Sequence, residues 1–196
     1  EFAKALAVLR SQAAPMPAQQ VRRVLGREYG KGWERRFAHF DWEPIAAASI
    51  GQVHRATARD GRDLALKIQY PGVARSIARD VDNVAVLLRL FNLLPLGIDV
   101  AGMAGEAKRQ LAQEADYESE GRFLERYAKL VADEPQLLMP RVHWDLTTQR
   151  VMAMDDMQGE PLESLRDAPS SRRDAACTLL EHLLEFLLPA YEKEGK

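Results

Sequence analysis

Residues 44–70 of the chain read PIAAASIGQVHRATARDGRDLALKIQY, and this stretch decides the fold. It contains two apolar runs, around Ile45–Ala48 and Leu64–Ile68. Between the later strands, Arg59-Asp60-Gly61 is a typical turn sequence, because aspartate and glycine tolerate the backbone angles of a tight reversal. The stretch therefore predicts three short strands joined by tight turns.

The flanking sequence has a different period. Apolar residues recur at helical spacing in residues 2–9, 21–25, 73–94 and 171–191, while the polar residues 101–130 predict one long helix. Two more strands are predicted at residues 141–145 and 150–155. The order of elements indicates an α+β fold class with a five-stranded antiparallel sheet and additional helices.

Composition excludes several classes of protein. The 196 residues are 46% hydrophobic and 29% charged, with a formal charge of -2. No basic field indicates a nucleic-acid partner, and no apolar run reaches the ~20 residues of a membrane-spanning helix. The single cysteine, Cys177, excludes an internal disulfide and fits a cytoplasmic setting. The four histidines are scattered without ligand spacing, so we expect no metal site: His39, His54, His143 and His182.

Lys67 stands at the end of an apolar strand, with Ala65 two residues before it. This is the A-x-K pattern of kinase strands, in which the lysine contacts the nucleotide phosphates and the alanine leaves room for adenine. Alone the pattern is weak, because a strand lysine is more often a solvated residue.

The alanine-rich segment, Ala46, Ala47, Ala48 and Ser49, lies where a kinase places its glycine-rich phosphate loop. Alanine tolerates positive φ poorly and keeps the backbone farther from phosphate. A small-residue strand packed on a helix is therefore the alternative interpretation.

Residues 46–54, followed by Lys67-Ile68-Gln69-Tyr70-Pro71-Gly72-Val73, resemble the alanine-rich loop and lysine strand of the UbiB (AarF-domain) family. Gln113-Glu114-Ala115-Asp116-Tyr117 resembles the E-x-D motif of that family, with Glu120 where another acid often stands. The resemblance covers at least residues 44–161.

The resemblance implies catalytic roles for Lys67, Glu114 and Asp116. Glu114 is expected to pair with Lys67, as a helix glutamate does in active kinases, or to lie close enough for a small helix movement to join them. Positions two apart on one helix face different ways, so Asp116 must have another role. The resemblance implies that it braces the alanine-rich loop and an upstream motif of the family. Without the resemblance, both acids would be assigned to a solvated helix face.

The resemblance also implies a nucleotide site. Met154 would be the gatekeeper beside adenine, with the Asp155 carbonyl and the Met157 amide as its hydrogen-bonding groups. The nucleotide-binding residues implied are Ala46, Ala47, Ala48, Ser49, Gly51, Gln52, Val53, Ala65, Lys67, Met154, Asp155 and Met157.

Three domains are expected: a helical extension at 1–43, a kinase-like small lobe at 44–157 with an inserted helix at 73–94, and the start of a large lobe at 158–196. The catalytic-loop carboxylate and D-F-G aspartate of a phosphotransferase are not found in the sequence. We therefore expect a piece of a longer protein, inactive by itself, with its Mg²⁺ ligands elsewhere.

By resemblance, the parent protein binds ATP or ADP with Mg²⁺ and supports ubiquinone biosynthesis as an ATPase or small-molecule phosphotransferase. The expected partners are an isoprenoid lipid, a membrane surface and quinone-biosynthesis proteins, with a cytoplasmic location or a peripheral one on the inner membrane. The alternatives are a protein kinase and a non-catalytic pseudokinase that binds partners.

Overall fold

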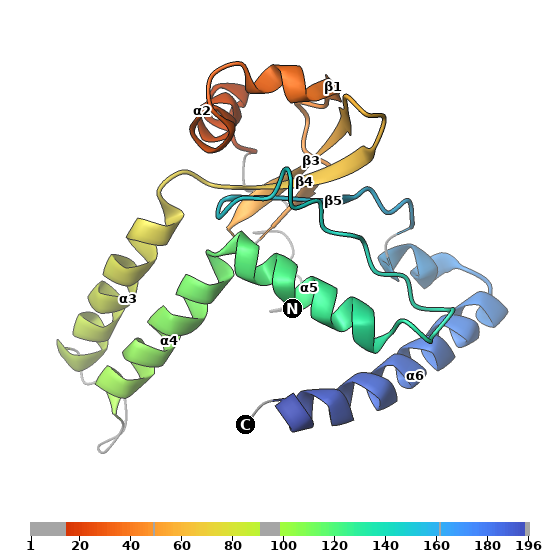
Figure 1. Cartoon of the computed structure of the whole chain (residues 1–196). Coiled ribbons are helices and arrows are strands. Elements are labelled where there is room, and N and C mark those ends of the chain that lie inside the picture. Colours follow the sequence, from red (N-terminus) through yellow and green to blue (C-terminus); the bar gives the residue numbers. More distant parts are fainter. Residues whose placement is uncertain (1–14, 49, 91–98, 161, 195–196) are drawn as a thin grey trace. The chain divides into compact units, whose positions relative to one another are not determined.

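The computed structural model describes residues 15–48, 50–90, 99–160 and 162–194 (Figure 1). The chain forms two compact units, Glu1–Asp133 with Met139–Asp156 and Glu134–Leu138 with Met157–Lys196. The first unit contains the sheet and most of the predicted site.

The sheet is antiparallel and five-stranded, which confirms the predicted fold class. Its order is β1-β3-β4-β5, and β2 also pairs with β3. The strands are β1 (Phe37–Phe40), β2 (Ala46–Ala47), β3 (Gly51–Ala58), β4 (Asp63–Gln69) and β5 (Val151–Asp155).

The sheet begins at Phe37, inside the segment that was predicted to be a helical extension ending at residue 43. Phe37 and Phe40 are joined to Trp33 by edge-on ring contacts with centroids 6.1 and 5.8 Å apart. Trp33 is the first residue of the short 3-10 helix η1 (Trp33–Arg36). The ring centroids of Trp33 and Trp42 are 6.2 Å apart. Aromatic packing, rather than an alternating pattern, therefore stabilises this edge of the sheet.

Residues 141–145 form a single bridge, Val142 to Met154, instead of the predicted strand. The cause is a side chain that replaces a backbone acceptor. The amide of Arg141 donates to the Asp155 carboxylate at 2.9 Å, while the Asp155 amide donates to the Arg141 carbonyl at 3.0 Å. A regular ladder cannot continue through this exchange.

One face of β4 forms the main core. Leu64, Leu66 and Ile68 alternate along the strand, and each is fully buried. They belong to the same apolar cluster as Val21 and Leu25 of helix α2 (Ala18–Tyr29). The opposite face is left for Ala65 and Lys67.

Three further helices belong to the same unit: α3 (Val73–Leu90), α4 (Val100–Glu114) and α5 (Tyr117–Leu130). Helix α3 corresponds to the predicted inserted helix, whose residues 91–94 lie outside the described ranges. The single helix predicted at 101–130 is wrong, because Ala115 and Asp116 separate α4 from α5.

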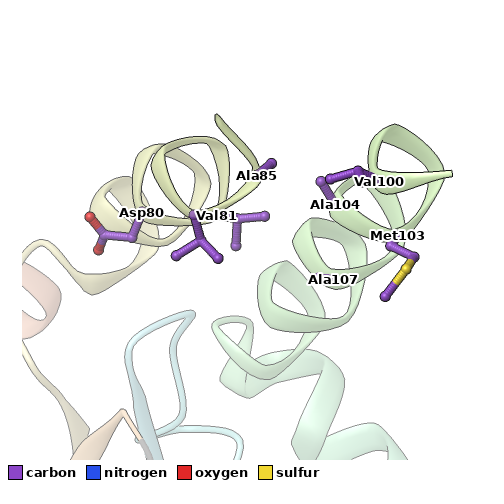
Figure 2. A pocket seen from close by; sticks show the side chains of 8 residues that line it. Asp80, Val81, Ala85, Val100, Met103, Ala104 and Ala107 are labelled. Carbon is purple, nitrogen blue, oxygen red and sulfur yellow. The ribbon is translucent and has the colours of Figure 1, made fainter. Parts of the chain in front are cut away.

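Helices α3 and α4 lie side by side, with an apolar groove of about 340 Å³ between them. Figure 2 shows Ala85 of α3 and Ala104 of α4 directed toward one another across it. Val84 and Met103, which also line the groove, are more than half exposed.

The second unit contains the 3-10 helix η2 (Leu162–Asp167) and helix α6 (Ser170–Glu194). Its Glu134 lies 3.1 Å from His182 of α6. Across the described parts of the chain, we find no helix that is both long and apolar enough to span a membrane.

A buried polar chain connects β3 to the segment before α2. Gln52 accepts a hydrogen bond from the Met16 amide at 2.7 Å, and its amide nitrogen lies 2.7 Å from Nε2 of His54. The His54 Nδ1 lies 2.8 Å from the Asp41 carbonyl. This arrangement fixes a neutral imidazole that donates from Nδ1 and accepts at Nε2. Burial lowers the pKa of His54 below its ordinary value, which favours the same neutral form.

We predict that acid weakens the fold through His54. Below about pH 6.5 His54 is protonated in the unfolded chain but stays neutral in the folded chain. The free energy of unfolding therefore decreases as the pH falls from about 6.5 to the lower pKa of folded His54. Above that pH the contribution is complete. Replacing the residue, His54→Gln, should lower stability by about 1–3 kcal/mol at neutral pH and remove this acid-dependent loss.

Urea unfolding of both proteins at about pH 7.5 and about pH 5.5 measures the difference. His39→Gln is the matched control, because His39 is largely exposed and is not part of the buried polar chain. An unchanged acid-dependent loss in His54→Gln would contradict the assignment.

Candidate functional site

The strand pairings place the predicted site residues on one face of the sheet. Val53 pairs with Lys67, which pairs with Met152, and Ala65 pairs with Met154. Directly paired residues point to the same side, as do residues two apart on a strand. Ala65, Lys67 and Met154 therefore share the face opposite the main core.

Lys67 is held in place by a carboxylate and an aromatic ring. Its Nζ lies 2.6 and 2.8 Å from the two carboxylate oxygens of Glu120 on α5. It also lies 4.7 Å from the ring centroid of Tyr117. The Lys67 side chain is only 16% exposed, so this charge-assisted contact is partly shielded from water.

The start of α5 explains why Glu120 reaches the sheet. Asp116 caps the helix by accepting from the amides of Glu118 and Ser119, and it also accepts the Ser119 hydroxyl at 2.8 Å. The Tyr117 amide donates to the Gln149 carbonyl at 3.1 Å. Tyr117 is fully buried, and Glu120 lies three residues later on the same helix face.

Gln69 fastens the junction between the two helices from the sheet side. Its amide nitrogen donates to the Ala115 carbonyl at 2.9 Å, and its side chain is 1% exposed. Because Gln69 follows Lys67 by two residues on β4, the same strand positions the lysine and the helix that carries its partner.

The predicted pairing of Lys67 with Glu114 is corrected by this geometry. Glu114 is the last residue of α4 and is exposed, whereas α5 supplies the bonded carboxylate. The two acids of the E-x-D motif are separated by a helix break, and Asp116 caps α5. Its predicted role in bracing the alanine-rich segment stays a prediction. Glu114 still lines the pocket next to Lys67.

The alanine-rich segment forms strand, turn and strand, as predicted. Ala46 and Ala47 make up β2 and pair with Val53 and Gln52. The Ala48 amide donates to the Gly51 carbonyl at 2.9 Å and closes the turn, in which Ser49 lies outside the described residues.

Two residues next to this turn, Gly51 and Gln52, were predicted to bind nucleotide, but the structure explains their presence in another way. Gly51 has room for no side chain, because a Cβ would collide with the Ile68 carbonyl and come 2.8 Å from the Tyr117 hydroxyl. Gln52 is 1% exposed and bonded to Met16, so its predicted place in the nucleotide site is wrong for the side chain. Alternation along β3 directs it to the main-core face.

The segment predicted to be the hinge begins with Met154, which is partly buried and packs on the cluster of Ile50, Tyr117 and Met152. Asp155 is the next residue. Met157 is 45% exposed and is the first residue of Met157–Lys196, the longer segment of the second unit.

Asp155 is fixed by His143. The His143 Nε2 lies 2.8 Å from the Asp155 carboxylate, and its Nδ1 lies 2.9 Å from an Arg62 guanidinium nitrogen. Burial opposes ionisation of Asp155, but hydrogen bonds from Arg141 and His143 lower its pKa below the ordinary value. Arg62 also pairs with Asp145 and Asp60, so this end of β5 is cross-linked to the β3–β4 turn.

A pocket of about 510 Å³ opens beside the ion pair, lined by Lys67, Gln110, Gln113, Glu114, Glu120 and Phe123. It contains one cation and two carboxylates, and both Glu120 oxygens are used by Lys67. Within the described ranges, no group of three or more histidine, cysteine, aspartate or glutamate side chains could hold a metal ion.

Sequence reasoning missed Glu120 as the partner and Tyr117 as the support of Lys67. A local signal for both was present. Asp116, followed by Glu118 and Glu120, is a typical helix start, with a capping residue and acids in the first turn. A helix that begins at Tyr117 would have placed Glu120, rather than Glu114, on the face that packs on the sheet.

The chain was compared with known proteins. A family model described as the ABC1 atypical kinase-like domain matches residues 8–190. The chain is 39% identical over 166 residues to the mitochondrial atypical kinase coq-8 of Caenorhabditis elegans, covering 85% of this chain and 22% of that protein. It is 34% identical over 188 residues to the mitochondrial atypical kinase COQ8 of Saccharomyces cerevisiae, covering 96% and 37%. The chain thus spans well under half the length of these relatives.

Among solved structures, the Rv3197–erythromycin complex from Mycobacterium tuberculosis superposes with a TM-score of 0.70 at 34% identity. The match covers 84% of this chain and 42% of that one.

We predict opposite effects for two tyrosine-to-phenylalanine replacements. Among the described residues, the buried Tyr117 hydroxyl finds no hydrogen-bond partner. Tyr117→Phe should therefore raise the free energy of unfolding by about 1 kcal/mol, since an unpaired buried polar group is removed. Tyr29→Phe should lower it by about 1 kcal/mol, because the Tyr29 hydroxyl donates to the Leu146 carbonyl at 2.5 Å.

Chemical denaturation of both variants tests the pair. A loss of stability in Tyr117→Phe equal to that in Tyr29→Phe would show that the Tyr117 hydroxyl has a partner in solution.

Proposed function

This chain belongs to the ABC1 atypical kinase-like family, and we propose from that membership that it is the nucleotide-facing lobe of an atypical kinase or ATPase. In this proposal Lys67 contacts the phosphates of ATP or ADP, and Ala65 and Met154 flank the adenine. The turn of Ala46 to Ser49 lies over the phosphates.

The observation that carries the proposal is the ion pair between Lys67 and Glu120. In protein kinases the strand lysine is competent for phosphate contact when a helix glutamate holds it. Here the lysine is held within hydrogen-bond distance of both carboxylate oxygens, on a strand that also presents Ala65. A merely solvated lysine would need no such partner.

The register supports the placement of the base. Ala65 and Met154 are paired across β4 and β5, so a flat ring packed over them would lie two residues along β4 from Lys67. Alanine leaves the space that a larger side chain would fill, and methionine adapts its shape to an aromatic neighbour. The Asp155 carbonyl and the Met157 amide remain the proposed partners of adenine.

The charges in the pocket indicate that the chain alone binds nucleotide weakly. One lysine faces two carboxylates, so a nucleotide with several negative charges meets no net cation in this pocket. Mg²⁺ supplies the missing positive charge in phosphotransferases, and we propose that other parts of the parent protein hold it.

The wider role follows from the family. We propose that the parent protein supports the biosynthesis of ubiquinone or a related isoprenoid lipid, at the surface of the inner membrane and with partner proteins of that pathway. The names of the relatives include mitochondrial atypical kinases, which agrees with such a location.

We predict that Glu120→Gln in the full-length parent weakens binding of Mg²⁺-ADP by about tenfold, because the neutral amide no longer holds the Lys67 ammonium. A thermal-shift titration measures this, since a ligand at about 100 times its Kd adds about 2.7 kcal/mol of stability. The 196-residue chain alone should show at most a small shift and no ATP hydrolysis.

Glu118→Gln is the matched control. It removes a carboxylate from the same helix, but one that pairs with Arg122 at 3.2 Å on the surface. Its nucleotide affinity should equal that of the wild type. Equal losses in both variants, or full-length protein that binds no nucleotide, would contradict the proposal, and the latter would favour a partner-binding pseudokinase.

A further inference from the structure

Gly121 directly follows the residue that holds Lys67, and it faces the segment that contains Val142 and Trp144. A Cβ at this position would lie 3.0 Å from Cη2 of Trp144 and 3.3 Å from Cγ1 of Val142. These distances are tighter than most Cβ contacts, so even an alanine would make the neighbouring ring give way slightly, and a larger residue would displace the ring or the helix. The missing side chain therefore lets α5 approach the segment that follows Pro140.

A glycine in a helix interior weakens the helix relative to alanine, and at Gly121 the close contacts supply a steric reason for it. Gly105 in α4 provides the contrast, because a Cβ there would meet nothing within 4 Å. Gly121 and Gly105 thus differ in the space around them.

The other side of the contact is held from the sheet. Val142 is 4% exposed and is bridged to Met154 of β5. Trp144 is 40% exposed, and its Nε1 donates to the Glu125 carboxylate at 2.5 Å. The Arg122 guanidinium lies 5.9 Å from its ring.

Three positions on α5 therefore contact the sheet side at intervals of four residues. Tyr117 bonds to Gln149, Gly121 packs on Trp144, and Glu125 accepts from the same indole. Residues at this spacing share one face of a helix. Glu120 adjoins that face, so its distance from Lys67 depends on how closely the face approaches.

We propose that Gly121 and Trp144 are positioning residues that set the spacing of α5 from the sheet and thereby allow Glu120 to bond to Lys67. The bonds of 2.6 and 2.8 Å leave little tolerance, because a displacement of about 1 Å takes them beyond hydrogen-bond range. Any effect of this spacing on nucleotide binding rests on the proposed function, whereas the spacing itself does not.

The test uses the full-length protein that contains this chain. Gly121→Leu should push α5 outward and release Lys67, whereas Gly105→Leu, placed in open space, should not. The readout is the acylation rate of Lys67 by an amine-reactive ester, followed by peptide mass spectrometry, with the exposed Lys31 as internal reference. We expect about a fivefold increase in Gly121→Leu, approaching the rate in Glu120→Gln, and no change in Gly105→Leu.

A second replacement separates positioning from general damage. Trp144→Ala in the Gly121→Leu background removes the ring that the new side chain meets, so the Lys67 rate should return toward the wild-type value. If Gly121→Leu does not fold, the milder Gly121→Ala is combined with Trp144→Ala, and the coupling between the two positions is measured by the same readout.

Unchanged Lys67 acylation in folded Gly121→Leu, an equal change in Gly105→Leu, or independent effects of the two positions would overturn the proposal. The assay needs no nucleotide. If the wild-type protein binds no Mg²⁺-ADP, the proposed function is refuted, but the acylation rates still decide whether Gly121 and Trp144 set the position of α5.

Discussion

The ion pair between Lys67 and Glu120 joins a central strand to a helix that starts 50 residues later in the chain, at Tyr117. Both side chains are partly withdrawn from water, so each depends on the other to compensate its lost hydration. Leaving either alone in this setting would cost more than an exposed pair contributes. Much of the surrounding structure keeps the Lys67 ammonium and the Glu120 carboxylate within hydrogen-bond distance of one another.

The contacts that do this are mostly hydrogen bonds in which at least one partner is a backbone group. The Asp116 carboxylate caps α5, the Tyr117 backbone amide donates to the Gln149 carbonyl, and the Gln69 side-chain amide donates to the Ala115 carbonyl. Each contact fixes the first turn of α5, which is also where Glu120 lies. The later turns of this helix depend instead on Trp144, an exposed side chain. The geometry of the site is thus determined most firmly at the helix start.

Local patterns in the sequence were enough to predict β3, β4 and β5, the turn of alanines and the lysine strand. Alternating burial and turn residues are properties of a few neighbouring positions. Once these predict the strand, the positions of Lys67 and Ala65 on it are predicted as well. The partner of Lys67 could not be found in this way. Glu114 and Glu120 are both acids in a helical stretch, and only the break at Ala115 decides between them. Strand β1 was missed because its stability comes from Trp33, which is outside the strand.

The hydrogen bonds between Gln52 and Met16 have a practical consequence for anyone who shortens the protein. The side-chain amide of Gln52 and the ring of His54 are buried in series, and the outermost link of the series is a main-chain group of Met16. A recombinant version beginning just after Met16 would keep every residue of the sheet yet leave a carboxamide oxygen buried without a donor. The sensible N-terminal boundary for expression therefore lies upstream of Met16, even though the first strand does not begin until Phe37.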